Sequence, residues 1–545
     1  MFRQGLRELG VETQSSNFFQ VDFTRSAHGE LALSEATVQK TLQAIAALSR
    51  LSAAETMQER HLREFRSAFM EKYETAEVSL AEVIDGEVGI GFPVLSSFGN
   101  ISKDLHAHAY IQGKPVEKHQ EPWHAYLQGQ YERVLKQGGQ ILDLKDEDIA
   151  KFPPKVNQLA PTFAAMLSLI SCNERDQIYL QSVGGTTANN LLGRFGDLDR
   201  SLGDLCQIIA DKEQTLLPDA VLAEIVHLPE GRVGNILQRP VLRKYEIPYL
   251  SGSSVGGEQS LPVADLTVAV EGSTIVLRSR KLGEKVVPRL SNAHNYAAHA
   301  LPVYHFLCAV QHQGKGALGI DWGEWAEGVT FLPRVTYKGV ILQAASWKFS
   351  HEDFVPVLTA ADPLEALRTF FDYWKLPASV AITQADNQLV CHTGRKEYRE
   401  LFLQEVRKTK SIQVVEWLHF AKDTDGQPYT HQVVVPLYQE SLPFVGLARQ
   451  AIPVALQRTF FPGSEWLYMK IYCGAHLSDR ILLEGLLEPL ETLRAGGVID
   501  KFFFIRYADP HYHIRLRLHL SEATTGFGAA LNCLYAALEP YTQKR

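Results

Sequence analysis

The stretch FFFIRYADPHYHIRLRLHL, from Phe502 to Leu520, contains the clearest structural pattern in the chain. The Ala-Asp-Pro segment 508–510 is a turn signal, so the two flanking runs are predicted to pair as a β-hairpin. The even positions from Tyr512 onwards are aromatic or aliphatic and predict a strand face that packs in a core. The odd positions of the same run carry basic or imidazole side chains: His511, His513, Arg515, Arg517 and His519.

The odd face of this run has two interpretations. A solvated strand face is the ordinary one, because charged side chains are usual there. A solvated face normally mixes both signs of charge, however, and like charges opposite one another destabilise a sheet by up to about 1 kcal/mol. A row of cations without an acid, with Arg506 close by, instead indicates an anion-binding surface. Paired arginines are the usual choice for carboxylate or phosphate recognition. The pattern alone leaves both interpretations open.

Three further segments complete a small domain around this hairpin. The run EWLYMKIYCG is predicted to be a strand, residues 478–495 a helix with Ser478 as N-cap, and residues 521–538 a last helix. The resulting β-α-β-β-α order is typical of an α/β sandwich in which helices cover one face of a sheet. A domain boundary is predicted near residues 450–464.

The sequence before this boundary alternates between helical and strand patterns. Residues 34–51 are predicted to be a helix with Ser34 as its N-cap. Its apolar face is predicted to consist of Val38, Leu42, Ile45 and Leu48. Other predicted elements are strand 17–24, helices 53–74, 121–138 and 363–374, hairpins around Glu271-Gly272 and Lys338-Gly339, and a strand over ASVAITQADNQLVCH. We therefore expect a multidomain α+β fold with mixed helices, mainly antiparallel sheets and an α/β-sandwich C-terminal portion.

The composition limits the class of protein. The 545 residues carry a net charge of −8, which argues against coating nucleic acid by bulk charge but leaves room for a local basic groove. The six cysteines are scattered without a CxxC pair, so a reducing compartment is expected rather than a disulfide framework or a zinc ribbon. No secretory signal is visible, and no stretch reaches the roughly 20 apolar residues of a membrane span. We expect a cytoplasmic protein without membrane insertion.

The stretch QIYLQSVGGTTANNLLGRFGDL is a second candidate site, which we predict to be a strand, a Gly-Gly turn and then a helix. Free backbone N–H groups at such a helix start can cradle a phosphate, with Arg194 as a further anion contact. An ordinary helix N-terminus explains the same pattern, because the stretch is neither a P-loop nor GxGxxG.

Two further stretches contain residues typical of binding sites. Residues 227–249 alternate basic and aromatic side chains, which either contact RNA or belong to a mobile surface loop. Those side chains are Arg232, Arg239, Arg243, Lys244, Tyr245 and Tyr249. The stretch PRLSNAHNYAAHALPVYHF contains His294, His299 and His305, whose spacing fits no standard zinc set, so structural histidines and no metal are expected.

Several segments occur in a telling order: FFQVDF, IDGEVGIGFP, NNLLGRFGDL, HLPEGRVGNILQRPVLRKYEIPY, DLTVAV, VVPRLSNAHNYAAHALPVYHFL, LPRVTYKGVILQAASWKF and EWLYMKIYCG…IDKFFFIRYADPHYHIRLRL. Taken together, they resemble the lantibiotic dehydratase family of the LanB type. The resemblance covers nearly the whole chain and is highly specific as an ensemble. The last segment resembles the start of the family's thiopeptide-type C-terminal domain.

The resemblance implies an enzyme that modifies a ribosomally made precursor peptide. An N-terminal domain of the family transfers glutamate from glutamyl-tRNA to Ser or Thr side chains, and a C-terminal domain eliminates it to leave dehydroalanine or dehydrobutyrine. The implied partners are therefore a precursor peptide and glutamyl-tRNA, which is a co-substrate, and no cofactor is implied. A cyclase, a second dehydratase subunit and a homodimer are further partners compatible with the family.

The resemblance also implies site residues. Arg515 and Arg517 match the Arg-x-Arg of the family's HxRxR strand and are implied in elimination, where they would bind the carboxylate and carbonyl of the glutamyl group. Asp22 matches the Asp of QVDF and Arg194 matches the Arg of GRF, and both are implied in glutamylation.

The implied domains are residues 1–455 for glutamylation, incomplete at the N-terminus, and 463–545 for elimination, truncated at the C-terminus. Relatives continue into an ExxRYG-type segment and a late catalytic histidine, so we expect this chain alone to be inactive, as a fragment or as one piece of a split enzyme. Two alternatives remain: a ligase that adds an aminoacyl group without elimination, and a non-catalytic peptide- or tRNA-binding subunit.

Overall fold

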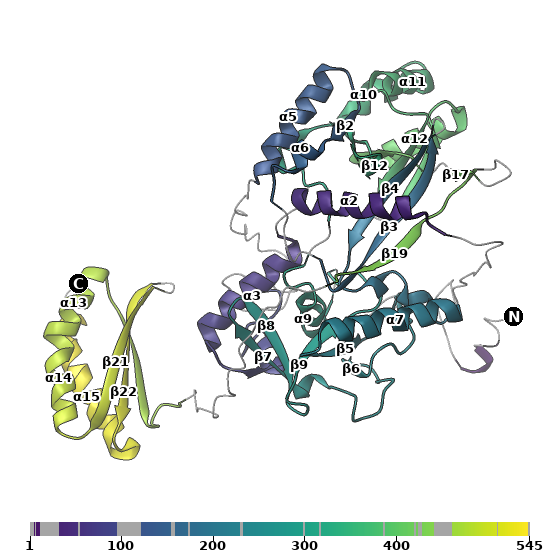
Figure 1. Ribbon diagram of the computed structural model, residues 1–545. Helices are drawn as coiled ribbons and strands as arrows, with labels where there is room; N and C mark the ends of the chain where they lie inside the picture. Colours follow the sequence, from purple (N-terminus) through teal and green to yellow (C-terminus); the bar gives the residue numbers. More distant parts are fainter. Residues whose placement is uncertain are drawn as a thin grey trace. The chain divides into compact units, whose positions relative to one another are not determined.

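The computed structural model of the chain separates into two compact units, Met1–Val445 and Gly446–Arg545 (Figure 1). The residues that it describes are 5, 7–10, 32–52, 55–94, 121–153, 159–172, 175–228, 233–297, 300–315, 318–384, 387–418, 421–422, 428–440, 460–508 and 511–542. Helices combine with mainly antiparallel sheets in both units, which confirms the predicted α+β class. The predicted strand 17–24 lies outside the described residues.

One six-stranded sheet of the first unit is built on a long antiparallel hairpin. Its strands, in spatial order, are β19 (Val433–Tyr438), β3 (Thr162–Cys172), β4 (Arg175–Gly184), β12 (Val340–Gln343), β11 (Arg334–Tyr337) and β2 (Ile141–Leu144). Helix α2 (Glu35–Leu51) packs on β4 and β12, while α5 (Pro122–Lys136) and α6 (Asp146–Ile149) lie near β2 (Figure 1). The hydroxyl of Ser34 accepts the N–H of Thr37, which confirms the predicted N-cap of α2.

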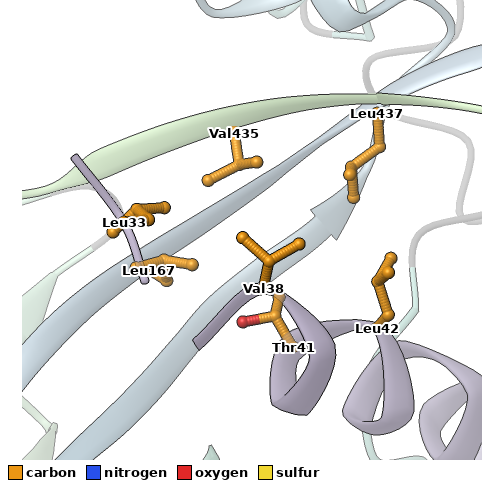
Figure 2. A pocket seen from close by; sticks show the side chains of 7 residues that line it. All are labelled: Leu33, Val38, Thr41, Leu42, Leu167, Val435 and Leu437. Atoms are coloured by element: carbon orange, nitrogen blue, oxygen red, sulfur yellow. The ribbon is translucent and has the colours of Figure 1, made fainter. Parts of the chain in front are cut away.

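The predicted apolar face of α2 is only partly correct, because Leu42 is 40% exposed. The core side of the helix is shifted by one position, so Thr41 is buried in its place. Figure 2 shows Leu42 beside a small apolar depression between α2 and strands β3 and β19. Its lining residues are Leu33, Val38, Thr41, Leu42, Leu167, Val435 and Leu437. A cavity of about 10 Å³ holds on the order of one water, so the depression is a packing feature.

A second six-stranded sheet packs against helices α3 (Met57–Tyr73), α4 (Leu80–Ile84) and α9 (Pro302–Val310). Its strands, in spatial order, are β1 (Val78–Ser79), β7 (Leu266–Glu271), β8 (Thr274–Ser279), β9 (Lys285–Arg289), β5 (Val221–Val226) and β6 (Tyr245–Pro248). The β7–β8 hairpin confirms the one predicted around Glu271-Gly272. The β11–β12 hairpin around Lys338-Gly339 is confirmed too, with both turn residues at positive φ.

The first unit also contains a two-stranded sheet of β17 (Ala421–Lys422) and β18 (Pro428–Tyr429), and a five-stranded antiparallel sheet covered by helices α10 (Val355–Leu358), α11 (Pro363–Tyr373) and α12 (Lys396–Lys408). Its strands, in spatial order, are β10 (Phe331–Leu332), β13 (Ser346–Ser350), β16 (Ser411–Glu416), β14 (Ser379–Gln384) and β15 (Asn387–His392). The single strand predicted over ASVAITQADNQLVCH is wrong, because β14 and β15 pair with each other as a hairpin. A bidentate ion pair between Arg334 and Glu416 joins this sheet to the first one.

The second unit has the predicted β-α-β-β-α order. Strand β22 (Tyr512–Leu520) lies between β20 (Trp466–Tyr472) and β21 (Ile499–Ala508), antiparallel to both. Helical segments α13 (Ala475–Arg480), η6 (Ile481–Leu486), α14 (Leu487–Ala495) and α15 (Ala523–Thr542) lie on one face of this sheet (Figure 1). The predicted cap Ser478 is wrong: the helix begins three residues earlier, after Gly474, and Ser478 is fully buried inside it.

Candidate functional site

The two faces of β22 differ as the sequence pattern predicts. Its even residues Ile514, Leu516 and Leu518 are fully buried in the core beneath the helices. Its odd residues lie on the opposite face, where the neighbouring strands contribute mainly aromatic side chains. Those cross-strand neighbours are Trp466, Tyr468, Lys470 and Tyr472 of β20, and Lys501, Phe503, Ile505 and Tyr507 of β21.

Arg517 is held between two aromatic rings. In register it lies between Tyr468 of β20 and Phe503 of β21. Its guanidinium carbon is 4.9 Å from the centroid of the Tyr468 ring and 5.5 Å from that of Phe503. Rings on both sides fix a planar guanidinium through cation–π contact and leave its N–H edge as the bonding surface. Arg517 is therefore arranged to bind a planar anion such as a carboxylate.

Arg515 is fixed by a stacked ring and by a hydrogen bond. Its guanidinium carbon lies 3.7 Å from the centroid of the Tyr507 ring. Its Nε donates to Nε2 of His513 over 3.0 Å, and Nδ1 of His513 lies 2.8 Å from the carbonyl oxygen of His511. Among the described residues, no carboxylate forms an ion pair with Arg515 or Arg517. The two arginines thus form a cationic pair without a carboxylate partner in the part of the chain that the structure describes.

The predicted row of five cations without an acid needs correction at three positions. His511 precedes the strand and contributes its carbonyl group. His513 is fully buried and accepts a hydrogen bond at Nε2, which requires a neutral ring. Nδ1 of His519 lies 2.8 Å from the Asp500 carboxylate. The acid was missed because it comes from the neighbouring strand, at a register shift between Ile499 and Lys501.

Arg194 lies in the first unit, in the 3-10 turn η2 (Gly193–Phe195), and is partly buried. Its guanidinium carbon is 5.0 Å from the centroid of the Phe195 ring. Gly193 is buried against residue 291, and a Cβ at Gly193 would lie 2.0 Å from the carbonyl oxygen of Ser291. The turn therefore needs glycine before Arg194 because the backbone of another segment lies in direct contact.

Of the two interpretations of the Gly-Gly turn, the phosphate cradle is not supported by the hydrogen bonds around it. Oδ1 of Asn190 accepts the backbone N–H groups of Thr186 and Thr187, and the Thr162 hydroxyl accepts that of Ala188. The backbone donors that a phosphate would need are therefore used within the protein. The helix predicted directly after the turn is wrong: two short 3-10 turns, η1 (Ala188–Asn190) and η2, come first, and α7 (Arg200–Leu216) begins only afterwards.

A buried ionic network lies next to this turn. Its members are Glu213 of α7, Glu224 of β5, Glu246 of β6, Arg289 of β9, and Arg239 and Arg243, which come between α8 (Gly234–Leu237) and β6. Arg243 donates from Nη2 to Glu213 over 2.5 Å and from Nε to Glu224 over 3.2 Å. Glu224 also accepts from the backbone N–H and the hydroxyl of Ser291, the residue that contacts Gly193.

This network corrects the interpretation of residues 227–249 as an RNA-binding or mobile loop. Arg239 and Arg243 have side chains only 8% and 3% exposed, so they contact buried glutamates and are not available to RNA. Lys244 is exposed and lies over Tyr245, whereas Arg232 lies outside the described residues. The sequence could not predict this burial, because the glutamates that pair with Arg239 and Arg243 come from three other elements, α7, β5 and β6.

Opposite charge keeps Glu213 and Arg243 ionised. Burial would raise the pKa of Glu213, but the positive charges of Arg243 and Arg289 more than offset this and hold the pKa below its ordinary value. Burial would lower the pKa of Arg243, which Glu213 and Glu224 raise instead. Because each buried charge depends on a partner, the network fixes the relative positions of the strands around it.

The remaining predicted residues fall in two groups. Asp22 and His299 lie outside the described residues. Nδ1 of His294 lies 2.9 Å from the hydroxyl of Tyr304, and His305 packs edge-on against Phe92 with ring centroids 5.1 Å apart.

Among the described residues, no group of three or more histidines, cysteines or acids is arranged to hold a metal ion. No helix among them is long and apolar enough to span a membrane.

Comparison with known proteins adds two family models, which match separate parts of the chain. The model "Lantibiotic dehydratase, N terminus" matches residues 2–402, and "Lantibiotic biosynthesis dehydratase C-term" matches residues 466–545. The chain belongs to the lantibiotic dehydratase family. The resemblance seen in the sequence is thereby confirmed.

The curated relatives of this chain are distant in sequence. The subtilin biosynthesis protein SpaB of Bacillus subtilis is 22% identical over 480 residues, which are 84% of this chain and 46% of SpaB. The nisin biosynthesis protein NisB of Lactococcus lactis subsp. lactis is 21% identical over 548 residues, 97% of this chain and 52% of NisB. The chain spans about half the length of these curated relatives.

A solved structure supports the fold of this chain. The tRNA-dependent lantibiotic dehydratase MibB from Microbispora sp. 107891 superposes with a TM-score of 0.72 at 22% identity. The similarity covers 94% of this chain and 49% of MibB. Arg194 lies in the part matched by the N-terminal family model, and Arg515 and Arg517 lie in the part matched by the C-terminal one.

Sequence reasoning missed the aromatic residues that hold the arginine pair. Tyr468, Phe503 and Tyr507 come from strands that pair with β22 only in the folded unit. The spacing of Trp466, Tyr468 and Tyr472 at even positions in EWLYMKIYCG was the one available signal, since it places all three on one strand face.

Proposed function

We propose that this chain carries parts of both active centres of a glutamyl-tRNA-dependent peptide dehydratase. One part would transfer glutamate to Ser or Thr hydroxyls of a precursor peptide, and the other would eliminate it to give dehydroamino acids. The observation that carries the proposal is that one chain matches both family models, over residues 2–402 and 466–545. The names of SpaB, NisB and MibB support a role in lantibiotic biosynthesis.

The first half-reaction is an acyl transfer. A peptide hydroxyl oxygen attacks the ester carbonyl of glutamyl-tRNA, the tRNA leaves with its hydroxyl restored, and the peptide side chain becomes a glutamyl ester. Hydroxide is a poor leaving group, and a carboxylate is a better one, so this step activates the side chain. The matches of Arg194 to GRF and of Asp22 to QVDF support a role for both residues in this step.

The second half-reaction is an elimination. A base removes the α-proton, the bond between Cβ and the ester oxygen breaks, and glutamate leaves with the electron pair. Arg515 and Arg517 would bind the carboxylate and carbonyl of the glutamyl group. Their stacked, partly buried guanidinium groups without an acid partner among the described residues support this role.

The test is a reconstitution followed by mass spectrometry. The full-length protein is incubated with its precursor peptide, tRNA, glutamate, ATP and glutamyl-tRNA synthetase, and a matched reaction omits the synthetase. We expect glutamyl adducts and peptides that have lost one water per modified residue, both absent without the synthetase. A peptide left unmodified in the complete reaction contradicts the proposal.

Two other outcomes identify the alternative functions. A peptide that gains an amino acid through an amide bond and keeps it indicates a ligase that does not eliminate. Binding of precursor or tRNA without any modification, measured over a salt titration, indicates a non-catalytic subunit. Product mass and linkage therefore distinguish the two enzymatic functions, and the binding measurement identifies the non-catalytic one.

A further inference from the structure

His513 is a fully buried polar side chain on the face of the sheet that carries the arginine pair. We propose that His513 is a positioning residue for Arg515: it binds the Nε edge of the guanidinium and thereby reserves the two terminal nitrogens for a carboxylate. This inference rests on the proposed elimination function, because the carboxylate is that of the glutamyl group. The inference goes further than that function, because it specifies which nitrogens of Arg515 bind the carboxylate.

The hydrogen bonds of His513 specify one tautomer. The carbonyl oxygen of His511 can only accept, so Nδ1 of His513 must carry the proton in their 2.8 Å contact. Nε2 then has a free lone pair and accepts from Nε of Arg515 at 3.0 Å. A doubly protonated ring would instead place an N–H donor against the Arg515 donor. Both ring nitrogens are therefore used, and the imidazole is neutral.

Packing holds the ring and the guanidinium in this arrangement. Tyr472 and Tyr507 lie directly across from His513 on the two neighbouring strands, with ring centroids 5.0 and 6.0 Å from that of His513. Tyr507 also supports the guanidinium of Arg515 at 3.7 Å. Stacking on Tyr507 thus sets the plane of the Arg515 guanidinium, and the hydrogen bond with His513 prevents its rotation within that plane.

The consequence is a choice between two bonding edges. A guanidinium binds a carboxylate either through Nε with one terminal nitrogen or through both terminal nitrogens. His513 occupies Nε, so the end with two terminal nitrogens is the edge that remains for a bidentate carboxylate. An arginine already fixed in its bound orientation loses less conformational entropy when the ligand binds.

Two matched substitutions separate this role from simple packing. In His513→Gln, the side-chain oxygen reaches the position of Nε2 and can still accept from Arg515. In His513→Asn, the shorter amide reaches only the position of Nδ1, so the contact with Arg515 is lost. Both replacements are polar amides of similar bulk, and thermal unfolding of the two variants checks that a difference in rate does not come from a difference in folding.

Elimination is measured with the full-length protein and a chemically synthesised glutamylated precursor peptide, so tRNA and the acyl-transfer step are not needed. We expect His513→Asn to lower kcat/KM by about 10- to 100-fold. His513→Gln is expected to recover most of the loss. Equal rates for both variants, or a better rate for His513→Asn, would overturn the inference.

A spectroscopic measurement tests the same arrangement without activity. The full-length protein is labelled with ¹⁵N-histidine and ¹⁵N-arginine, and the signals of residue 513 are assigned from their loss in His513→Gln. We expect the Nδ1–H tautomer for His513 and a hydrogen-bonded Nε–H for Arg515. An Nε2–H tautomer would refute the positioning role even in an active enzyme. If the wild type does not eliminate glutamate, the proposed function fails, and this measurement alone decides the inference.

Discussion

Arg243 and Glu213 form an ion pair inside the first unit, with 2.5 Å between Nη2 and Oε2 and with side chains only 3% and 0% exposed. Two charges at this depth are tolerated because each is bonded to more than one partner. Arg243 also binds Glu224, and Glu213 also accepts from the hydroxyl of Thr162. The pair therefore depends on a network that several segments have to complete together.

Removing Arg243 should destabilise the protein severely. Arg243→Met leaves Glu213 and Glu224 buried without their shared partner, and losses of about 3–5 kcal/mol are typical of such a change. The measurement is the free energy of unfolding in urea, followed by tryptophan fluorescence. The control is Arg368→Met, which removes an exposed pair with Glu365 on helix α11 and should have no measurable effect.

A double substitution refines this prediction. Arg243→Leu together with Glu213→Leu removes one charge of each sign and leaves two arginines and two glutamates, although Arg289 loses its contact with Glu213. We expect the double variant to lose less stability than Arg243→Leu alone. If the double variant lost as much free energy of unfolding as Arg243→Leu and Glu213→Leu lose together, the two side chains would contribute independently rather than as a pair.

Stability should fall as the pH drops below 6.5, in part because of His312. Burial, with a smaller contribution from the positive charge of Arg289, lowers the pKa of His312 from 6.5 to about 4. Above pH 6.5 the ring is neutral in both states, so its contribution is fully present. Between the two values the unfolded chain binds a proton that the folded protein does not, so up to roughly 3 kcal/mol is lost.

The check is the free energy of unfolding of the wild type and of His312→Asn between pH 7 and pH 4.5. The wild type should lose stability relative to the variant as the pH falls, because asparagine does not titrate. A difference that stays constant over this range contradicts the prediction.

Gly193 should not tolerate a side chain. In Gly193→Ala the new Cβ would lie 2.0 Å from the carbonyl oxygen of Ser291, which is backbone and cannot rotate away. We expect a loss of at least about 1–3 kcal/mol, measured by thermal unfolding. Gly129→Ala is the matched control: Gly129 is exposed in helix α5 with open space around it, so alanine should stabilise the helix by roughly 0.5–1 kcal/mol.

Substitutions of the arginine pair should separate the two half-reactions. Arg517→Lys keeps the charge but loses the planar group between Tyr468 and Phe503, so elimination should fail while glutamylation continues. Mass spectrometry of the reconstituted reaction should then show glutamylated peptide accumulating, and Arg515→Ala should give the same product. Arg494→Ala, which removes an exposed pair with Glu491 in the same unit, should leave the product distribution unchanged. Unmodified peptide from Arg517→Lys would place this residue in the first half-reaction instead.

The strand pattern was predictable from sequence where one face is core and the other is not. Alternation over residues 512–520 gave the correct buried face of β22, and local turn chemistry gave the hairpins at Glu271-Gly272 and Lys338-Gly339. Each of these signals comes from residues that are close together in the sequence. The assignment of Arg194, Arg515, Arg517 and Asp22 to catalysis stays a prediction.

Local sequence patterns could not predict the buried ionic network or the aromatic rings of Tyr468, Phe503 and Tyr507 beside the arginines. A basic run such as RPVLRK predicts an exposed segment. Burial of Arg243 is favourable because Glu213 and Glu224, which are distant in sequence, form ion pairs with it in the folded protein. Likewise, Ser478 has the chemistry of a helix cap but lies within helix α13, which begins at Ala475 and contacts strand β22.

Strand β22 is paired along both edges, and this limits how a peptide can approach Arg515 and Arg517. The backbone N–H and C=O groups of the central strand are already used, so a substrate cannot add to it as a further strand. Under the proposed function, this site would therefore recognise the peptide through the glutamyl group held by the arginines, and not by the addition of a strand to β22.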